Sequence, residues 1–105
     1  MTINTIAFFG VTKQDSYNRA KKYLMKLTYG DVRYVRDQPR INTLYADLTD
    51  GTRIMNLSSD ISSLGHRYTD LVIQKGIDQD IVNTIIRPML IDHENGDPYT
   101  IEWYD

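Results

Sequence analysis

Residues 65–77, with the sequence GHRYTDLVIQKGI, contain the residue types of a nucleotide-handling loop. A glycine precedes a basic pair, Asp70 follows, and a short apolar strand then runs to Ile73. In many nucleotide-hydrolysing proteins such a strand ends on acidic residues that hold a metal ion and activate water. Here it ends on Gln74 and Lys75, so the carboxylates of that chemistry are missing from the position that needs them.

Residues in and around this stretch could instead bind a small molecule of the nucleotide type. Arginine makes bidentate contacts with phosphate, an asparagine amide can read a base or a ribose, and a tyrosine ring can stack on adenine. The candidate ligand-binding residues are Arg67, Asp70, Arg53, Arg87, Asn56, Tyr45 and Tyr68. Asp70 could also pair with Arg67 as a structural brace of the loop, and the sequence leaves both interpretations open.

Other catalytic chemistries find little support in the sequence. His66 and His93 lack the spacing of metal ligands, cysteine is absent, and the serines between 58 and 63 have no base to orient them. The segment FFGVTKQDS (8–16) holds one glycine and not the phosphate-loop pattern, although the first N–H groups of the helix that it opens could bind an anion. We therefore expect no catalytic residue, metal or cofactor. A residual enzyme would have to use Asp47 and Asp70 as its carboxylate pair.

Residues 47–90 resemble the second half of the ATPase core of phage terminase large subunits. In that family a hairpin leads to an RGxRxD loop, a buried strand, an acidic pair and a helix. Gly65, Arg67, Asp70 and the strand at 71–73 match this pattern, while the acidic pair falls at Gln74–Lys75 and the phosphate loop is missing. The resemblance implies shared ancestry with a phage protein, and it suggests a small phage accessory protein that no longer hydrolyses nucleotide.

Length and charge restrict the remaining possibilities. The chain has 105 residues, enough for one domain with its own core, and we expect a single domain over 1–105. Its net charge is −2, and the basic cluster at 18–26 fits the solvated face of a helix, so nucleic-acid binding is not expected.

No apolar run reaches the ~20 residues of a membrane span, and the N-terminus lacks the basic region of a signal peptide. Together with the absence of cysteine, this predicts a cytoplasmic protein without a membrane partner, in the host cytoplasm if a phage encodes it.

The first half of the chain predicts a strand, a helix and a hairpin. The apolar run 5–10 reads as a buried strand, and Thr12 with Asp15 predicts the start of a helix whose apolar stripe runs to Leu27 and which Gly30 ends. Residues 32–36 predict another strand. Residues 42–58 then alternate around Asp50-Gly51, which we expect to supply the two positive-φ residues of a tight hairpin turn.

The second half predicts a loop over 58–66, a strand covered on both faces at 71–73, and a helix over 79–90 that Asp78 caps and Pro88 bends. Asn95-Gly96 predicts a turn before a last strand at 99–103. The expected order is β-α-β-β-β-β-α-β. We therefore predict an α/β (α+β) fold, with two helices on a single mixed, mainly antiparallel sheet.

Two functions compete at this level. The first is a non-enzymatic anti-defence protein that sequesters a nucleotide-derived immune signal, of the cyclic nucleotide or ADP-ribose type. The alternative is an inhibitor or assembly factor that binds a host or phage protein through the apolar face of helix 79–90 or through the Tyr99–Trp103 edge. A homo-oligomer is expected in either case, because that helix is broadly apolar and the last strand forms an exposed edge.

Overall fold

The computed structural model describes residues 3–58 and 67–105. Its strands are β1 (Thr5–Gly10), β2 (Val32–Gln38), β3 (Thr43–Leu48), β4 (Arg53–Ser58), β5 (Asp70–Gln74) and β6 (Thr100–Tyr104). Its main helix is α1 (Lys13–Met25), and α2 (Gln79–Ile81) begins a second helical segment between β5 and β6. Short 3-10 turns at Tyr29–Asp31 and Pro39–Ile41 flank β2. This confirms the expected element order. The loop expected after Ser58 lies outside the described residues.

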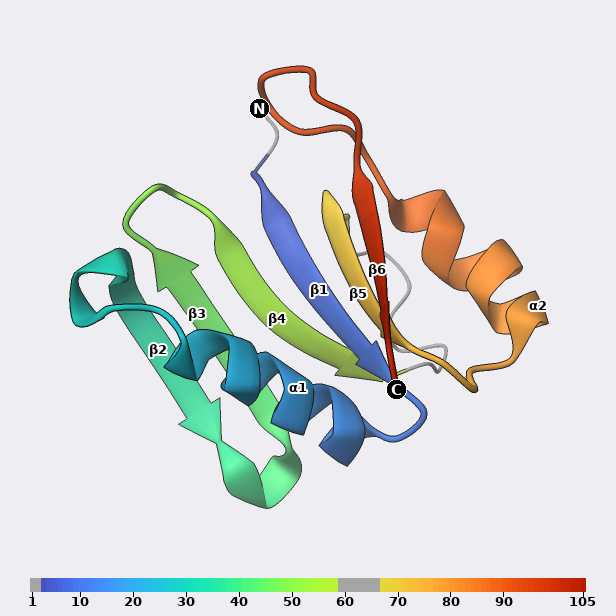
Figure 1. Ribbon diagram of the computed structural model, residues 1–105, viewed down its shortest axis with the longest axis horizontal. Coiled ribbons are helices and arrows are strands. Elements are labelled where there is room, and N and C mark those ends of the chain that lie inside the picture. Colours follow the sequence, from blue (N-terminus) through green and yellow to red (C-terminus); the bar gives the residue numbers. More distant parts are fainter. Residues whose placement is uncertain (1–2, 59–66) are drawn as a thin grey trace.

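The strands form one mixed sheet in the order β2-β3-β4-β1-β5-β6 (Figure 1). The expectation of a mainly antiparallel sheet was wrong, because three of the five pairings in the described part of the chain are parallel. Only β2, β3 and β4 are joined by short turns, which produce antiparallel neighbours. The pairs β1–β4, β1–β5 and β5–β6 are joined by long connections, which permit parallel pairing.

Each face of the sheet packs on one helical segment, so the molecule has two apolar cores. Phe8 of β1 faces the first core with Tyr17 and Ala20 of α1. Its neighbours Ala7 and Phe9 face the second core, beneath the α2 segment. The alternation along β1 is what a central strand covered on both faces requires. In Figure 1 the two helical segments accordingly lie over different strands, with α1 near β2–β4 and α2 near β6.

Helix α1 begins as the sequence predicts but ends earlier. The Thr12 hydroxyl accepts a hydrogen bond from the Asp15 N–H at 3.1 Å and donates one to the Asp15 carboxylate at 2.9 Å. The helix ends at Met25 with Lys26 as its right-handed cap. The prediction that Gly30 ends the helix in a left-handed cap was wrong, because Gly30 lies in the following 3-10 turn and is not among the positive-φ residues.

The hairpin is confirmed, with a wider turn than expected. β3 and β4 pair antiparallel, and Leu48 N–H donates to the Thr52 carbonyl at 2.8 Å. Gly51 has φ +91°, but Asp50 does not take a positive φ. Instead, the Asp50 carboxylate accepts the Thr52 N–H at 2.8 Å, so a side-chain bond replaces the second left-handed residue.

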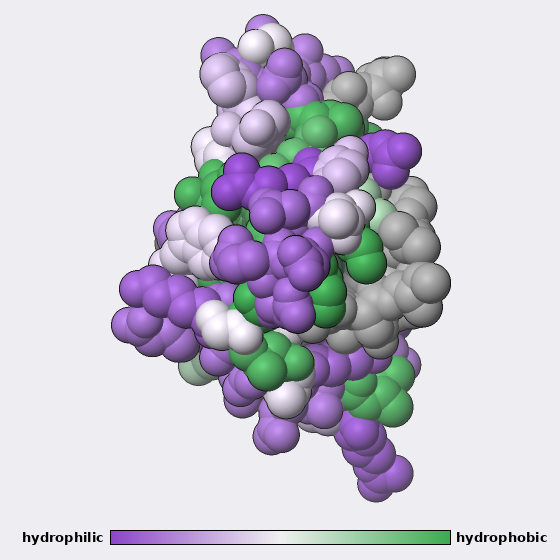
Figure 2. Space-filling model, turned by 90° about the vertical axis from the view of Figure 1, so that its right-hand side faces the viewer, coloured by the Kyte–Doolittle hydropathy of each residue, from purple (hydrophilic) through white to green (hydrophobic). Residues whose placement is uncertain are grey.

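The expected helix over 79–90 is not a continuous α-helix. Asp78 caps α2 as predicted, but Val82–Ile86 is π-helical and Arg87–Met89 is a 3-10 turn. Pro88 has no N–H to donate to the carbonyl one turn earlier, so the α-helical ladder cannot continue through it. The apolar side chains of this segment pack into the second core; they are Ile81, Val82, Ile85, Ile86, Met89 and Leu90. Figure 2, which faces this side of the molecule, shows a mainly hydrophilic surface with small separate apolar patches. The helix face therefore gives no support to the expected oligomer contact.

Candidate functional site

Asn56, predicted to read a base or a ribose, is a buried structural residue. It is 5% exposed on β4. Its amide oxygen accepts the Leu44 N–H at 2.7 Å, and its amide nitrogen donates to the Ser16 hydroxyl at 3.1 Å and to the Asn42 carbonyl at 2.8 Å. These bonds tie β4 to α1 and to the start of β3. The signal in the sequence was the alternation with Ile54, which places Asn56 on the same inward face.

Tyr68, predicted to stack on adenine, is fully buried. Its hydroxyl donates to the Ile86 carbonyl at 3.1 Å, and its ring meets Phe9 edge-on at 5.6 Å between ring centroids. Burial raises the pKa of this phenol well above its ordinary value. The ring therefore packs the second core and offers no exposed face to a ligand.

Asp70 contacts His93, a partner that the sequence did not suggest. The His93 Nε2 lies 2.9 and 3.0 Å from the two carboxylate oxygens, and the Thr100 hydroxyl donates to the same carboxylate at 2.5 Å. The other ring nitrogen of His93 lies 2.9 Å from the Pro98 carbonyl. Asp70 thus connects β5 to the turn before β6, and His93 holds that turn.

Arg53 and Tyr45 are the two predicted ligand-binding residues that the described contacts bring together. The Arg53 guanidinium lies over the Tyr45 ring at 5.5 Å, and its Nε is 3.6 Å from the Asp47 carboxylate. Arg33 approaches the same carboxylate at 3.8 Å, and Tyr34 meets Tyr45 edge-on at 6.3 Å. Arg67, before β5, and Arg87, after the π-helical segment, are both exposed. The seven predicted residues therefore fall into several sites.

Asp47 and Asp70 cannot act as one carboxylate pair. Asp47 lies on β3 and Asp70 on β5, with β4 and β1 between them in the sheet. Three strand spacings separate their backbones by about 14 Å. Their side chains also lie on opposite faces of the sheet, because Asp70 aligns with Ile6 of the first core, whereas Asp47 alternates with Ala46 and Leu48 of that core. In addition, no cluster of three metal-ligating side chains occurs among residues 3–58 and 67–105.

Polar groups of the chain itself bind N–H groups of the loop between β1 and α1, where the sequence suggested that an anion could bind. The Gln74 side-chain oxygen accepts the Val11 N–H at 2.8 Å, and the Thr12 cap occupies the Asp15 N–H. The Asp15 carboxylate in the first turn places a negative charge where an anion would bind. Gln74 stands where the terminase resemblance puts an acidic residue. Here it holds the loop by a neutral hydrogen bond.

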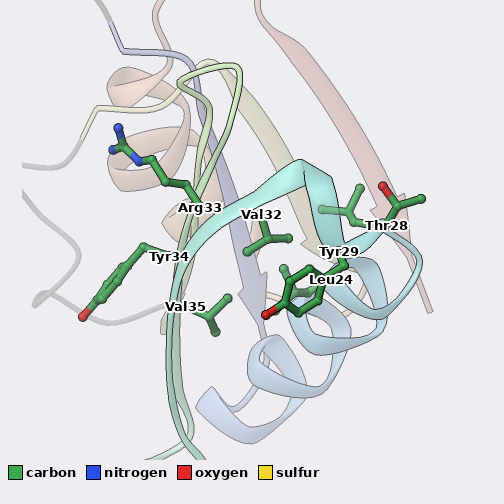
Figure 3. Close-up of a pocket in the computed structure, with 8 residues that line it drawn as sticks. Leu24, Thr28, Tyr29, Val32, Arg33, Tyr34 and Val35 are labelled. Atoms are coloured by element: carbon green, nitrogen blue, oxygen red, sulfur yellow. The ribbon is translucent and has the colours of Figure 1, made fainter.

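A pocket of about 410 Å³ opens between the end of α1 and the edge strand β2, and we call it the β2 pocket. It is lined by Leu24, Leu27, Thr28, Tyr29, Val32, Arg33, Tyr34 and Val35. Figure 3 shows Leu24, Tyr29, Val32 and Val35 gathered on one side of the strand, with Arg33 and Tyr34 pointing to the other side. The lining is thus mainly apolar on the α1 face, and the side chains of Arg33 and Tyr34 lie on the opposite face of the strand.

A β-bulge shapes the β2 pocket. Val32 pairs with Leu48 and Val35 with Ala46, which are two residues apart on β3, although the valines are three apart on β2. The extra residue lies between Val32 and Tyr34, where the register shifts, so both valines face α1. Sequence reasoning predicted only a strand at 32–36, and in a regular strand Val32 and Val35 would lie on opposite faces.

Two contacts hold α1 against β2 beside the pocket. The Tyr17 hydroxyl donates to Asp37 at 2.5 Å, and the Lys21 ammonium donates to the same carboxylate at 2.6 Å. The Lys21 bond and then the Tyr17 bond lower the pKa of Asp37 below its ordinary value. At the far end of the pocket, the Thr28 N–H and hydroxyl both donate to the Asp31 carboxylate, at 3.2 and 2.7 Å, and fix the turn that carries Tyr29, which is 99% exposed.

The charge of the chain is distributed unevenly around this site. Eight of the twelve basic residues but only three of the fourteen acidic ones lie between Lys13 and Arg40, so that segment has a net charge of +5 and the rest of the chain −7. The segment consists of α1, β2 and the turns beside them. Counting charges by segment therefore locates the basic side of the molecule.

Comparison with known proteins adds one structural relative. No protein-family model matches the chain, and no curated protein matches it. The fold is similar to the ATPase domain of the large terminase of Thermus phage P74-26, a structure of its R139A mutant, with a TM-score of 0.62 and 14% sequence identity. The match covers 96% of this chain and 47% of that chain, so this chain spans about half the length of the terminase domain. The similarity shows a shared fold that extends well beyond residues 47–90.

None of the helices in the described ranges is long and apolar enough to cross a membrane.

Proposed function

We propose that this chain is a non-enzymatic accessory protein of the phage type, and that it binds a protein partner through the edge strand β2 and the β2 pocket. The observation that carries the proposal is the combination of an apolar pocket with a strand edge in the basic segment. Within the described residues β2 pairs with β3 alone, and Arg33–Gln38 are all exposed. An extended segment of a partner can add to such an edge through backbone hydrogen bonds, while a neighbouring pocket selects its side chains.

The composition of the surface supports a protein ligand. Tyr29 and Val35 are exposed beside the partly buried Leu24, Leu27 and Val32, and Met25 is also exposed at the end of α1. Exposed apolar groups on a strand edge that also carries arginine and tyrosine are typical of protein–protein interfaces. Because Arg33, Arg36 and Arg40 follow this edge, the partner segment should be acidic.

The proposal is tested by selecting peptides from a displayed library of random peptides with the purified full chain. We expect enriched peptides to combine Asp or Glu with an aromatic or branched apolar residue. Their binding should fall at least about tenfold in Val35→Lys and Tyr29→Ser, which change exposed side chains of the pocket. Val11→Lys, an exposed apolar residue at the other end of α1, is the matched control and should bind normally. Equal binding to all four proteins, or no enrichment, would refute the proposal.

Sequestration of a nucleotide-derived signal is the second candidate, and the cluster around Asp47 is the observation that favours it. There two arginines, Arg33 and Arg53, lie beside two tyrosine rings. A thermal-shift panel of cyclic dinucleotides, cyclic trinucleotides and ADP-ribose isomers tests it. A ligand at a hundredfold its Kd should stabilise the fold by about 2.7 kcal/mol. Arg53→Ala should abolish that shift; a panel without any shift would eliminate this candidate.

A further inference from the structure

The two edges of the sheet carry opposite charge. On one edge, Arg33, Arg36 and Arg40 are accompanied by a single acid, Asp37, which Lys21 already binds. On the other edge, residues 91–105 contain no lysine or arginine and five acidic residues, namely Asp92, Glu94, Asp97, Glu102 and Asp105. Arg19 offsets Glu102 at 3.0 Å and Lys75 offsets Asp105 at 3.2 Å, so this edge keeps an acidic excess.

The edge strands also have the same polarity within the sheet. β2 is antiparallel to β3, β3 is antiparallel to β4, and β4, β1, β5 and β6 are mutually parallel. β2 and β6 are therefore parallel to each other. A second copy placed beside the first, and rotated about the axis across the strands to follow the twist of the sheet, would set its β6 along β2 of the first copy, with corresponding faces of the two sheets on the same side.

The exposed side chains of these edges complement each other on the α2 face. Trp103 aligns with Ile73, which belongs to the second core, so its ring lies on that face and is 38% exposed. On β2, Arg36 aligns with Tyr45, which alternates with the inward residues of the first core and so lies on the same α2 face. An exposed arginine on one edge and an exposed indole on the other are suited to a cation–π contact.

We propose that the segment that occupies the β2 edge is β6 of a second copy of this chain, so that copies associate head to tail through parallel strand pairing. This proposal rests on the proposed function, because it names the partner of the same surface. The contact joins two different surfaces of each copy, so it leaves a free β2 edge at one end and a free β6 edge at the other. Because the two strands are short, the interface is small and the association weak, in about the micromolar to millimolar range. It should also weaken as salt increases.

Sedimentation equilibrium of the full chain at low and high salt measures this directly. We expect the average mass to rise with concentration at low salt and to return toward the monomer at high salt. Two charge-reversed variants identify the surfaces: Arg33→Glu with Arg36→Glu on β2, and Glu102→Lys with Asp105→Lys on β6. All four side chains are more than half exposed or lie on the exposed edge, so the fold should persist.

Each variant alone should associate at least about tenfold more weakly than the wild type, because its two edges carry like charge. An equimolar mixture of the two variants should associate again, since every contact between unlike copies is complementary. A wild type that stays monomeric at low salt would overturn the proposal, as would a β6 variant that associates like the wild type. If the wild type is monomeric while acidic peptides bind it and not Val35→Lys, self-association fails and the proposed protein-binding function stands. If neither peptides nor copies bind, both fail.

Discussion

Asn56 makes three hydrogen bonds inside the core, and all its donors and acceptors there face protein groups. The sequence predicts that this amide is buried, but it does not predict which groups the amide binds. The sequence shows a polar residue on the inward face of a strand, and burial requires partners for it. It does not show that those partners come from residues 12, 14 and 40 positions away. The interpretation of Asn56 as a ligand-reading residue failed because its partners are distant in the chain.

Replacing Asn56 by leucine should therefore destabilise the fold. The Leu44 N–H and the Asn42 carbonyl would lose their partner in a buried site, at a cost of about 2–4 kcal/mol. Urea unfolding measures the change, with Asn18→Leu as a control on the exposed face of α1. A stability equal to that of the wild type would show that Asn56 is not structural and would restore it as a candidate ligand-binding residue.

The charge of His93 should affect stability near neutral pH. Both of its ring nitrogens face acceptors, the Asp70 carboxylate and the Pro98 carbonyl, so the protonated ring can donate to both. Partial burial lowers the pKa of His93, but the bonds to Asp70, Asp97 and Pro98 raise it by more, and the pKa lies above the ordinary value of 6.5. Asp92 and Glu94 flank the ring in sequence and add negative charge nearby.

A pKa that is raised in the folded state predicts the direction of the pH effect. The stability that His93 contributes should be fully present below pH 6.5, the unfolded value, and should be lost as the pH rises through the higher folded pKa. The difference in unfolding free energy between the wild type and His93→Gln should therefore shrink from pH 6 to pH 9. His66→Gln provides the comparison for the other histidine. A difference that grows with pH would contradict the contact with Asp70.

At the scale of elements, local signals predicted local structure. Thr12 with Asp15 marked the start of α1, and the alternation of residues 43–48 marked β3, because each signal acts over a few residues. The bulge in β2 was not predictable in this way, since only its pairing with β3 reveals the extra residue. The β2 pocket depends on that bulge, so the candidate site was not predictable either.

Replacing Gly10 and Gly30 by alanine should have different effects on stability. A Cβ at Gly10 would lie 2.6 Å from the Ser16 nitrogen and 2.7 Å from the Thr12 carbonyl oxygen, both backbone atoms that cannot yield without moving α1. Gly10→Ala should cost about 2–4 kcal/mol. A Cβ at Gly30 would meet nothing within 4 Å, so Gly30→Ala should be neutral or stabilise by up to about 1 kcal/mol. Thermal unfolding of both variants checks the contrast. Equal effects of the two substitutions would contradict the close approach of Gly10 to the backbone of the β1–α1 turn.

At the scale of the whole molecule, the strand order carries the information that the sequence lacked. The pairing of β1 with β4 and β5 joins segments separated by about 50 and 65 residues, and no local pattern specifies it. The charge asymmetry, in contrast, was present in the sequence and needed only to be counted by segment. The strand order shows where this asymmetry lies in space. It places the basic segment at one edge of the sheet and the acidic residues 91–105 at the other.

Amide hydrogen exchange should report this arrangement. Amides of β1 and β5 should exchange most slowly, because these strands are buried and have neighbours on both sides, and amides of β2 should be among the fastest in the sheet. Raising the protein concentration at low salt should slow exchange in β2 and β6 while leaving β1 unchanged. If both edges are insensitive to concentration, the edges do not meet in solution.

The common direction of β2 and β6 has a geometric consequence for any stack of copies. Neighbouring strands rotate by about 20–25°, so six strands accumulate about 120–150° from one copy to the next. At a strand spacing of about 4.8 Å, each copy also advances about 29 Å along the stack. The symmetry operation that relates neighbouring copies is therefore a screw rotation with between about two and three copies per turn. The stack completes one turn about every 70–90 Å. A screw does not close on itself, so such a stack would grow as a thin filament whose length the protein concentration sets.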